Sequence, residues 1–259
     1  MIDFPSTADF LAVISDRRFV AAAAISAASG LVRGFSGFGS ALIYVPLMAS
    51  VYEPRVAAVS FLLIDFATGL TFVFSVWRNA VWREILPLAA AALTAAQFGT
   101  LILQYADPTL LRWVIALFIA ALLPVLMSGW RYHGRPMLVV TIGVGVLAGT
   151  LGGAIQISGP PIILYWLGSA HEATVMRANF VSYFALFAAG SLVTYLAHGL
   201  ITAQVIALAI LIGPLHIFAM WLGGRVFRFA SEATYRRVAY VIIAAAALFS
   251  MPLFDGLLR

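Results

Sequence analysis

The sequence predicts an all-α, polytopic membrane protein with two homologous halves. Of its 259 residues, 63% are hydrophobic and 10% are charged, whereas soluble domains carry about 25% charged residues. Its apolar runs are long and lack the period-two alternation of barrel strands, so we expect helices to cross the bilayer. Glycine-rich interruptions recur at matching places in the two halves, a pattern typical of transporters with internal repeats.

Charge and cysteine content exclude several classes of function. All fifteen basic residues are arginines, and the net charge is +5. The arginines lie at the ends of apolar segments, where they act as topology signals and contact headgroups, so we expect no nucleic-acid partner. The absence of cysteine excludes disulfides, thiolate metal sites and cysteine nucleophiles, and we expect no metal or cofactor. We expect a multi-pass protein of the inner (cytoplasmic) membrane, surrounded by lipid.

We expect an interfacial N-terminal tail at 1–17, a first membrane repeat at 18–133 and a second at 134–259. Eight apolar stretches are predicted, at about 18–51, 55–77, 84–104, 109–130, 136–169, 174–197, 201–222 and 234–254. The first and fifth are much longer than the roughly 20 residues that span a bilayer, and they carry the glycines. Each is predicted to form two half-helices joined by a loop.

The two interruptions align with each other. The first lies in Gly30–Pro46 (GLVRGFSGFGSALIYVP) and the second in Gly145–Pro161 (GVLAGTLGGAIQISGPP). Further matches follow in the same order, and they pair Glu53 with Glu172, Val56 with Val175, Phe61 with Phe180, Gly99 with Gly224, Thr109 with Thr234 and Arg112 with Arg237. Irregular backbone at membrane depth is tolerated only inside protein or against a wet cavity. The interruptions therefore predict the functional centre.

Arginine placement indicates whether the broken stretches cross the bilayer. If both cross, the arginines outside the apolar centre divide equally between the two sides. If both are re-entrant hairpins, most of these arginines share one side, as the positive-inside rule expects. The second arrangement is favoured, and it implies inverted halves with three spans each.

The glycine blocks, the sequence GGAIQISGPPIILYW after the second interruption and the segments PRVAAVSFLLIDF and ATVMRANFVSYF resemble the TauE/SafE family of membrane permeases. The resemblance covers essentially the whole chain. It implies a secondary transporter, not an enzyme, that moves small anions such as sulfite, sulfonates and related organosulfur acids. The first block departs from the family's usual consecutive glycines, because Phe38 separates Gly37 from Gly39.

Arg33 and Asp65 are the charged residues predicted deep in the membrane. An arginine there usually faces a cavity or a partner, so Arg33 either grips an oxyanion with its guanidinium fork or forms a structural ion pair with Asp65. Asp65, in the middle of the second stretch, either carries a coupled proton or only neutralises Arg33.

The predicted substrate-binding residues gather at the two breaks and at the start of the sixth stretch. They are Arg33, Gly34, Ser36, Gly37, Gly39, Gly152, Gly153, Gln156, Ser158, Gly159, Arg177 and Asn179. The glycines would let half-helix N-termini direct amides at an anion, or they would serve close helix packing. Thr150 is expected in the same loops as Ser36, Gln156 and Ser158. Arg177 and Asn179 are a counterpart to Arg33, or Arg177 is a topology signal.

Other polar and aromatic residues have structural interpretations. Gln97 and His216 lie inside apolar runs, and His216 is expected to bond a neighbouring helix. The tryptophans lie mostly near segment ends and are interpreted as interface anchors; they are Trp77, Trp82, Trp113, Trp130, Trp166 and Trp221.

Two alternatives from other classes stay open. Residues 34–37 spell a GxSG motif like that of rhomboid proteases, in which Ser36 would be the nucleophile and His198 or His216 the base. A membrane scaffold without transport is the other alternative. The favoured hypothesis is alternating access with one half rocking against the other, with proton coupling and a homodimer left open.

Overall fold

The computed structural model describes residues 4–36, 39–130, 132, 137–166, 168, 171–226 and 232–254, and every regular element in these ranges is a helix. The helices are α1 (Thr7–Ser15), α2 (Arg18–Ser36), α3 (Ser40–Val51), α4 (Pro54–Val76), η1 (Trp77–Asn79), α5 (Trp82–Tyr105), α6 (Pro108–Ser128), α7 (Leu138–Ile155), α8 (Gly159–Trp166), α9 (Ala173–Ala197), α10 (Ala203–Val226), α11 (Glu232–Ser250) and η3 (Pro252–Phe254). Each predicted apolar stretch is one helix or one broken pair, so the all-α prediction is confirmed.

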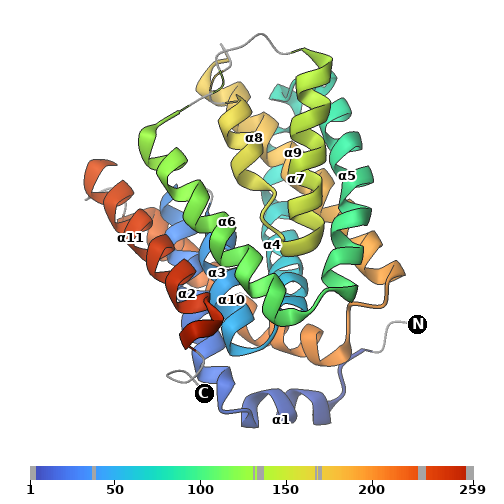
Figure 1. The fold of residues 1–259 in the computed structure, drawn as a ribbon, viewed down its shortest axis with the longest axis vertical. Helices are drawn as coiled ribbons and strands as arrows, with labels where there is room; N and C mark the ends of the chain where they lie inside the picture. The colour runs from blue at the N-terminus through green and yellow to red at the C-terminus, as the bar shows by residue number, and fades with distance from the viewer. Residues whose placement is uncertain are drawn as a thin grey trace. The chain divides into compact units, whose positions relative to one another are not determined.

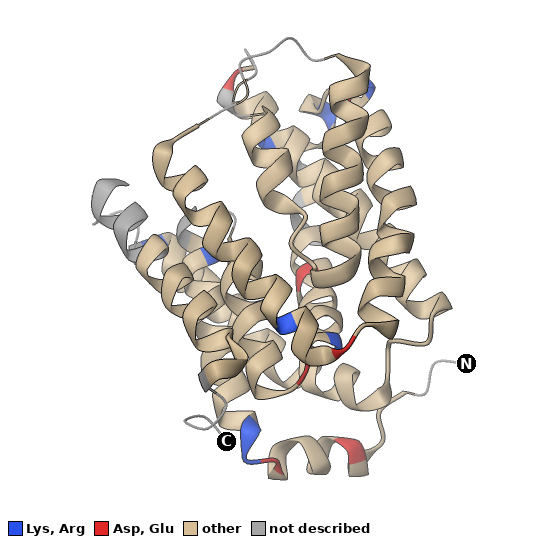
Figure 2. Ribbon diagram, viewed as in Figure 1, with Lys and Arg blue, Asp and Glu red and all other residues tan. Residues whose placement is uncertain are grey.

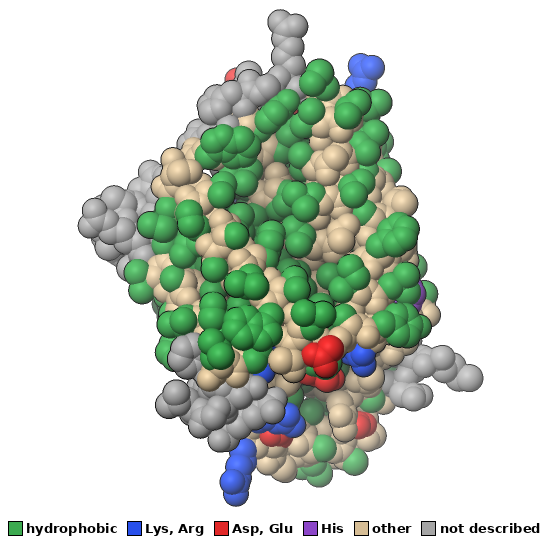
Figure 3. Space-filling view, viewed as in Figure 1, with side chains coloured by type: hydrophobic (Ala, Val, Ile, Leu, Met, Phe, Trp, Pro, Cys, Tyr) green, Lys and Arg blue, Asp and Glu red, His purple; other side chains and the backbone are tan. Residues whose placement is uncertain are grey.

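Five helices of the described chain are long and apolar enough to cross a membrane: α5, α6, α7, α9 and α10. Long stretches of helix carry no charged residue (Figure 2). Hydrophobic side chains are spread over much of the face shown in Figure 3. Many large hydrophobic side chains of the described chain are exposed, among them Phe98, Leu117 and Val193. Lipid is a better solvent than water for such a surface, which agrees with a multi-pass membrane protein.

The predicted tail folds as α1, which begins with a capping box. Ser6 Oγ accepts from Asp9 N, and the Asp9 carboxylate accepts from Ser6 N at 2.8 Å, so two otherwise unpaired donors are satisfied. The helix ends at Asp16, whose carboxylate accepts from Arg18 Nε. An interfacial position for this tail stays a prediction.

The chain divides into two compact units, each made of discontinuous segments. Unit 1 comprises 1–64, 106–128 and 200–259, and unit 2 comprises 65–105 and 129–199. Each unit therefore combines helices from both predicted sequence repeats, and α4 passes from unit 1 to unit 2 between Ile64 and Asp65. The units are defined by which residues contact one another in space, whereas the repeats are defined by sequence similarity. The two divisions of the chain therefore need not coincide.

In unit 1, α2 packs most extensively against α10, and α11 packs against α3 and α6. The α2–α10 contact is close because glycines face backbone. A Cβ at Gly30 would lie 3.1 Å from the carbonyl carbon of His216, and one at Gly34 would lie 2.7 Å from that of Met220. Small residues let membrane helices approach closely in this way. Ser26 Oγ adds a hydrogen bond across the same pair, to Ile212 O at 3.1 Å.

In unit 2, α5 and α7 lie side by side (Figure 1), and theirs is the most extensive helix contact in the described chain. A Cβ at Gly149 would lie 2.6 Å from the carbonyl carbon of Ala92, and one at Gly153 would lie 2.9 Å from that of Ala96. A buried apolar cluster joins this pair to α8 and α9, with Trp166 and Tyr183 among its members.

Both broken segments fold back on themselves as hairpins. In unit 2, Thr141 in the first turn of α7 and Tyr165 near the end of α8 share a hydrogen bond of 2.7 Å, and α8 runs back alongside α7 (Figure 1). In unit 1, the guanidinium of Arg18, the first residue of α2, lies 4.5 Å from the ring centroid of Tyr52, the residue that ends α3. Each hairpin therefore begins and ends at the same end of its pair.

Candidate substrate site

The turn of the second hairpin is a buried three-residue break. Gln156, Ile157 and Ser158 separate α7 from α8, and they are 8%, 1% and 6% exposed. Gln156 has φ 54° and ψ 22°, a left-handed conformation that no other described non-glycine residue adopts. Such a conformation costs free energy for a residue with a Cβ and persists only where its surroundings hold it.

Tyr195 of α9 holds this break in place. Its hydroxyl accepts from Gln156 Nε2 at 3.1 Å and donates to Gly153 O at 2.8 Å. The last turn of a helix leaves carbonyls without intrahelical partners, so the Tyr195 hydroxyl satisfies one of them while it positions the Gln156 side chain. The sequence analysis did not single out Tyr195.

The start of α8 offers fewer backbone donors than expected. The helix begins Gly159-Pro160-Pro161, and proline has no N–H. Prolines fit the first turn of a helix because those N–H groups have no intrahelical acceptor. The two prolines also remove two of the four free amides that a helix N-terminus would otherwise present to an anion. Side-chain donors therefore matter more for a ligand at this helix start.

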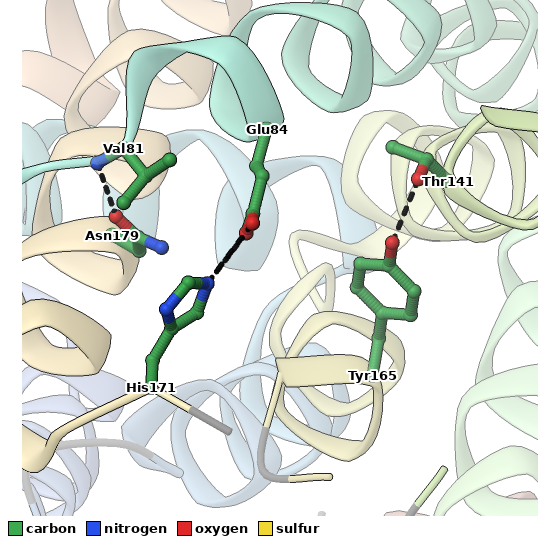
Figure 4. A network of polar contacts seen from close by, with 6 residues as sticks. All are labelled: Val81, Glu84, Thr141, Tyr165, His171 and Asn179. Atoms are coloured by element: carbon green, nitrogen blue, oxygen red, sulfur yellow. Dashed lines mark hydrogen bonds and ion pairs between the residues drawn. The ribbon is translucent and has the colours of Figure 1, made fainter. Parts of the chain in front are cut away.

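Two of the predicted site residues, Arg177 and Asn179, lie near the start of α9 and differ in burial. Asn179 is fully buried, and its Oδ1 accepts from Val81 N at 2.7 Å (Figure 4). Arg177 is exposed. Near the same helix ends, His171 Nε2 lies 3.0 Å from the Glu84 carboxylate. The geometry brings Asn179 into the interior of unit 2 and leaves Arg177 at its surface, as a topology arginine would be.

The first break contains the predicted cation. Arg33, partly buried in the last turn of α2, donates from Nη1 to Ser40 Oγ at 3.3 Å, across the break to the first residue of α3. Gly39 precedes α3 with φ 89°, and an added Cβ there would have no atom within 4 Å. Glycine at 39 is therefore required by backbone conformation and not by space. Gly37 lies outside the described residues, as does the side chain of Ser36.

The other predicted glycines have distinct surroundings. Gly34 and Gly153 face the backbone of α10 and α5, so helix packing alone accounts for them. A Cβ at Gly152 would lie 2.6 Å from Phe187 Cε1 and 3.0 Å from Ser158 Cβ, which places Phe187 beside the second break. A Cβ at Gly159 would make only ordinary contacts, the nearest at 3.6 Å from Phe184. A direct role in binding substrate stays a prediction for each of these glycines.

Two sequence expectations are wrong. Thr150 was expected in the loop of the second break, but it lies inside α7 and donates to Val146 O at 2.9 Å, because that helix continues to Ile155. Trp166 was interpreted as an interface anchor, but it is 1% exposed. It packs edge-on against Tyr183, with ring centroids 6.1 Å apart, because the hairpin turns the end of α8 into the core of unit 2.

The intramembrane histidine bonds a neighbouring helix, as expected. His216 Nδ1 donates to Ser26 O of α2 at 3.0 Å. Gln97 similarly donates to Thr194 Oγ1 of α9 at 2.7 Å. Asp65 lies in the middle of α4, where its carbonyl accepts from Thr68 Oγ1 at 2.9 Å. The proposed ion pair between Arg33 and Asp65 would join the two units, and it stays a prediction. No group of three or more acidic or histidine side chains in the described part of the chain could hold a metal ion.

The comparisons with known proteins agree with the resemblance seen in the sequence. The chain is 26% identical over 229 residues to the probable sulfite/organosulfonate exporter TauE of Cupriavidus necator, and the match covers 84% of this chain and 88% of that protein. No solved structure matches. The family model described as "Sulfite exporter TauE/SafE" matches residues 22–250. This is a transporter family, so the protease alternative is not supported. The match includes both broken hairpins and the helices that follow each of them, and the chain therefore belongs to the TauE/SafE family of membrane transporters.

Proposed function

We propose that the chain carries sulfite, an organosulfonate or a similar small sulfur oxyanion across the membrane by alternating access. The observation that carries this proposal is the pair of broken hairpins, one in each compact unit, with a buried polar turn in unit 2. In this proposal the bodies that move are the two units, and polar groups at the hairpin turns bind the substrate. The relative's printed name supports the class of substrate.

The hairpins also support inverted halves. A segment that enters and leaves at the same end contributes no net crossing, so α4, α5 and α6 would be the spans of the first half. By the same argument, α9, α10 and α11 would be the spans of the second. An odd number of crossings inverts the second half relative to the first. The equivalent packing of α2 on α10 and α7 on α5, with glycines four residues apart in both, is a further support.

In this proposal Arg33 is the cationic contact for the anion. Arg33 lies in the last turn of α2 beside the first break, and the planar fork of a guanidinium suits an oxyanion. Asp65 is the candidate for a coupled proton, because it lies in the middle of a membrane helix and at the point where the chain passes between units.

Efflux of sulfite from proteoliposomes tests the proposal. External 5,5′-dithiobis(2-nitrobenzoate) is cleaved by sulfite with release of a coloured thiolate, and the chain has no cysteine that would react with the reagent. We expect sulfite efflux above that of empty vesicles, and competition by internal methanesulfonate. Vesicles that hold the inserted protein and release sulfite no faster than empty vesicles would refute the assignment of substrate class.

Arg33→Gln should lower the efflux rate by about tenfold or more, because a charge-assisted hydrogen bond to the substrate is lost. Arg78→Gln is the matched control, since Arg78 is exposed in η1. Asp65→Asn should abolish the effect of a pH gradient and leave downhill efflux intact. An unchanged rate in Arg33→Gln would remove Arg33 from the site, and a gradient effect that survives Asp65→Asn would exclude Asp65 as the proton carrier.

A further inference from the structure

Unpartnered polar atoms are concentrated on two neighbouring helices of unit 2. Six buried side-chain atoms in the described part of the chain have no hydrogen-bond partner, and five of them belong to α8 or α9. Four of the five are close in sequence or in space: Trp166 Nε1, Asn179 Nδ2, Ser182 Oγ and Tyr183 OH. All four residues are at most 1% exposed. A buried polar group without a partner costs free energy, so such a concentration needs a reason.

The four groups share one region of unit 2. Asn179, Ser182 and Tyr183 are spaced i, i+3 and i+4 on α9, so they occupy one face of that helix. Trp166, the last residue of α8, packs against Tyr183 at 6.1 Å and against Phe180 at 5.5 Å between ring centroids. The end of α8 and the first half of α9 therefore place these four side chains in one buried region of unit 2.

The four unpartnered groups can all donate hydrogen bonds. Asn179 Oδ1 is occupied by Val81 N, which leaves its NH₂ group as the free part of the amide (Figure 4). An indole N–H and an amide NH₂ can donate and cannot accept, while a hydroxyl can do either. A water molecule that accepts from such donors must itself donate elsewhere. A ligand that only accepts can use every one of them.

The hydroxyl of Ser182, like that of Ser191 farther along α9, has no hydrogen-bond partner in the described structure. Buried helical hydroxyls commonly donate to a carbonyl three or four residues earlier. Those of Ser60, Thr100 and Thr194 do so here, at 2.6, 2.8 and 3.0 Å. Ser182 lacks such a bond in the described structure and so keeps its proton available.

We propose that Trp166, Asn179, Ser182 and Tyr183 form a subsite that binds the oxygens of a small oxyanion through neutral donors alone. The subsite rests on the proposed function and adds a second contact region to it. Neutral donors stabilise an anion without a permanent countercharge, so the empty site holds no buried charge and the bound anion is free to leave. The Glu84 carboxylate of unit 2 is hydrogen-bonded to His171 Nε2 at 3.0 Å, a side chain that is not part of the subsite.

The half-saturating sulfite concentration of proteoliposome efflux tests the subsite, with methanesulfonate as a second probe. Tyr183→Phe and Ser182→Ala each remove one hydroxyl and almost no volume, and Trp166→Phe removes the indole N–H. Each should raise the half-saturating concentration about tenfold, because one hydrogen bond to a charged ligand is lost. The thermal stability of Tyr183→Phe and Ser182→Ala without ligand should be unchanged or higher, because the deleted hydroxyl has no partner in the protein. Trp166→Phe also removes volume from a buried aromatic cluster, so its stability is expected to fall and is not part of this comparison.

Tyr165→Phe is the matched control. Its hydroxyl pairs with Thr141 inside the same unit, so the variant should be less stable and keep the wild-type half-saturation. Wild-type half-saturation in both Tyr183→Phe and Ser182→Ala, with wild-type flux intact, would overturn the subsite and leave the proposed function standing. A wild-type chain that moves no sulfur oxyanion would overturn both.

Discussion

Replacement of Gly149 by alanine tests whether the α5–α7 contact depends on backbone approach. The new Cβ would overlap the carbonyl oxygen of Ala92 and lie 2.6 Å from its carbonyl carbon and Cα. These distances fall about 0.8 Å short of the 3.4 Å at which ordinary contact begins. The obstructing atoms are backbone, so no side-chain rotation relieves the overlap, and the two helices must separate.

The magnitude follows from that separation. A gap of 0.5–1 Å forfeits about a quarter to a half of each dispersion contact. Overpacked cores lose about 1–3 kcal/mol, and we expect the upper part of that range, about 2–3 kcal/mol, because backbone must move. Alanine is also a better helix former than glycine by about 1 kcal/mol, which partly masks the loss in a single comparison.

Gly143→Ala removes that ambiguity. Gly143 lies on the same helix, it is exposed, and an added Cβ has no atom within 4 Å. Both variants gain the same helix propensity, so their difference isolates packing. In thermal unfolding in detergent, followed by tryptophan fluorescence, Gly149→Ala should melt roughly 5–10 °C below Gly143→Ala. Melting temperatures within about 2 °C of each other would refute the close approach of the two backbones.

Three further substitutions probe helix ends. Arg112→Ala should lower the free energy of unfolding by about 1–3 kcal/mol, because the buried Arg112 Nε donates to Ser250 O at the C-terminus of α11; equal melting temperatures for variant and wild type would contradict this. Gly39→Ala should cost about 1–2 kcal/mol through its φ of 89°, and a smaller loss in Gly39→Asn would distinguish backbone strain from crowding. The hydrogen bond from Arg18 lowers the pKa of Asp16 below its ordinary 3.8, so its contribution to stability is present above that value and lost as the pH falls through the folded pKa. The stability difference between wild type and Asp16→Asn should therefore begin to shrink as the pH falls below 3.8 and be gone once the pH is below the lowered pKa of the folded state; a difference that does not shrink in this titration would exclude the linkage.

The helices could be predicted from the sequence because hydropathy and length decide them in a bilayer. The second broken stretch was predicted over 136–169, and the structure has α7 and α8 between Leu138 and Trp166. The position of the break within the stretch was less certain. Glycine marks both flexible backbone and close packing, and Gly145, Gly149 and Gly153 all proved to be packing positions inside α7. The actual turn carries a left-handed glutamine, which no glycine pattern indicates.

The partners of the helices could not be predicted. Glycines four residues apart on α2 show that a small-residue face exists, but they do not say that it meets α10 rather than α5. The donor cluster was missed for a related reason. Asn179, Tyr183, Ser191 and Tyr195 lie four or eight residues apart along α9, with Phe187 at the intervening position, and this spacing was available as a signal for one largely polar face. Trp166 lies beside that face only because α8 folds back along α7, and the spacing of residues in the sequence does not reveal this fold-back.

The two breaks have equivalent folds and different chemistry. In the alignment that pairs Gly34 with Gly149, Arg33 corresponds to Ala148, which is fully buried against α5 in unit 2. The first break therefore carries a guanidinium in its last helical turn, while the second carries uncharged polar groups and two prolines where amides would otherwise be. If the proposed subsite binds the anion, unit 2 holds it through neutral donors alone, so no buried charge is left without a partner when the anion leaves.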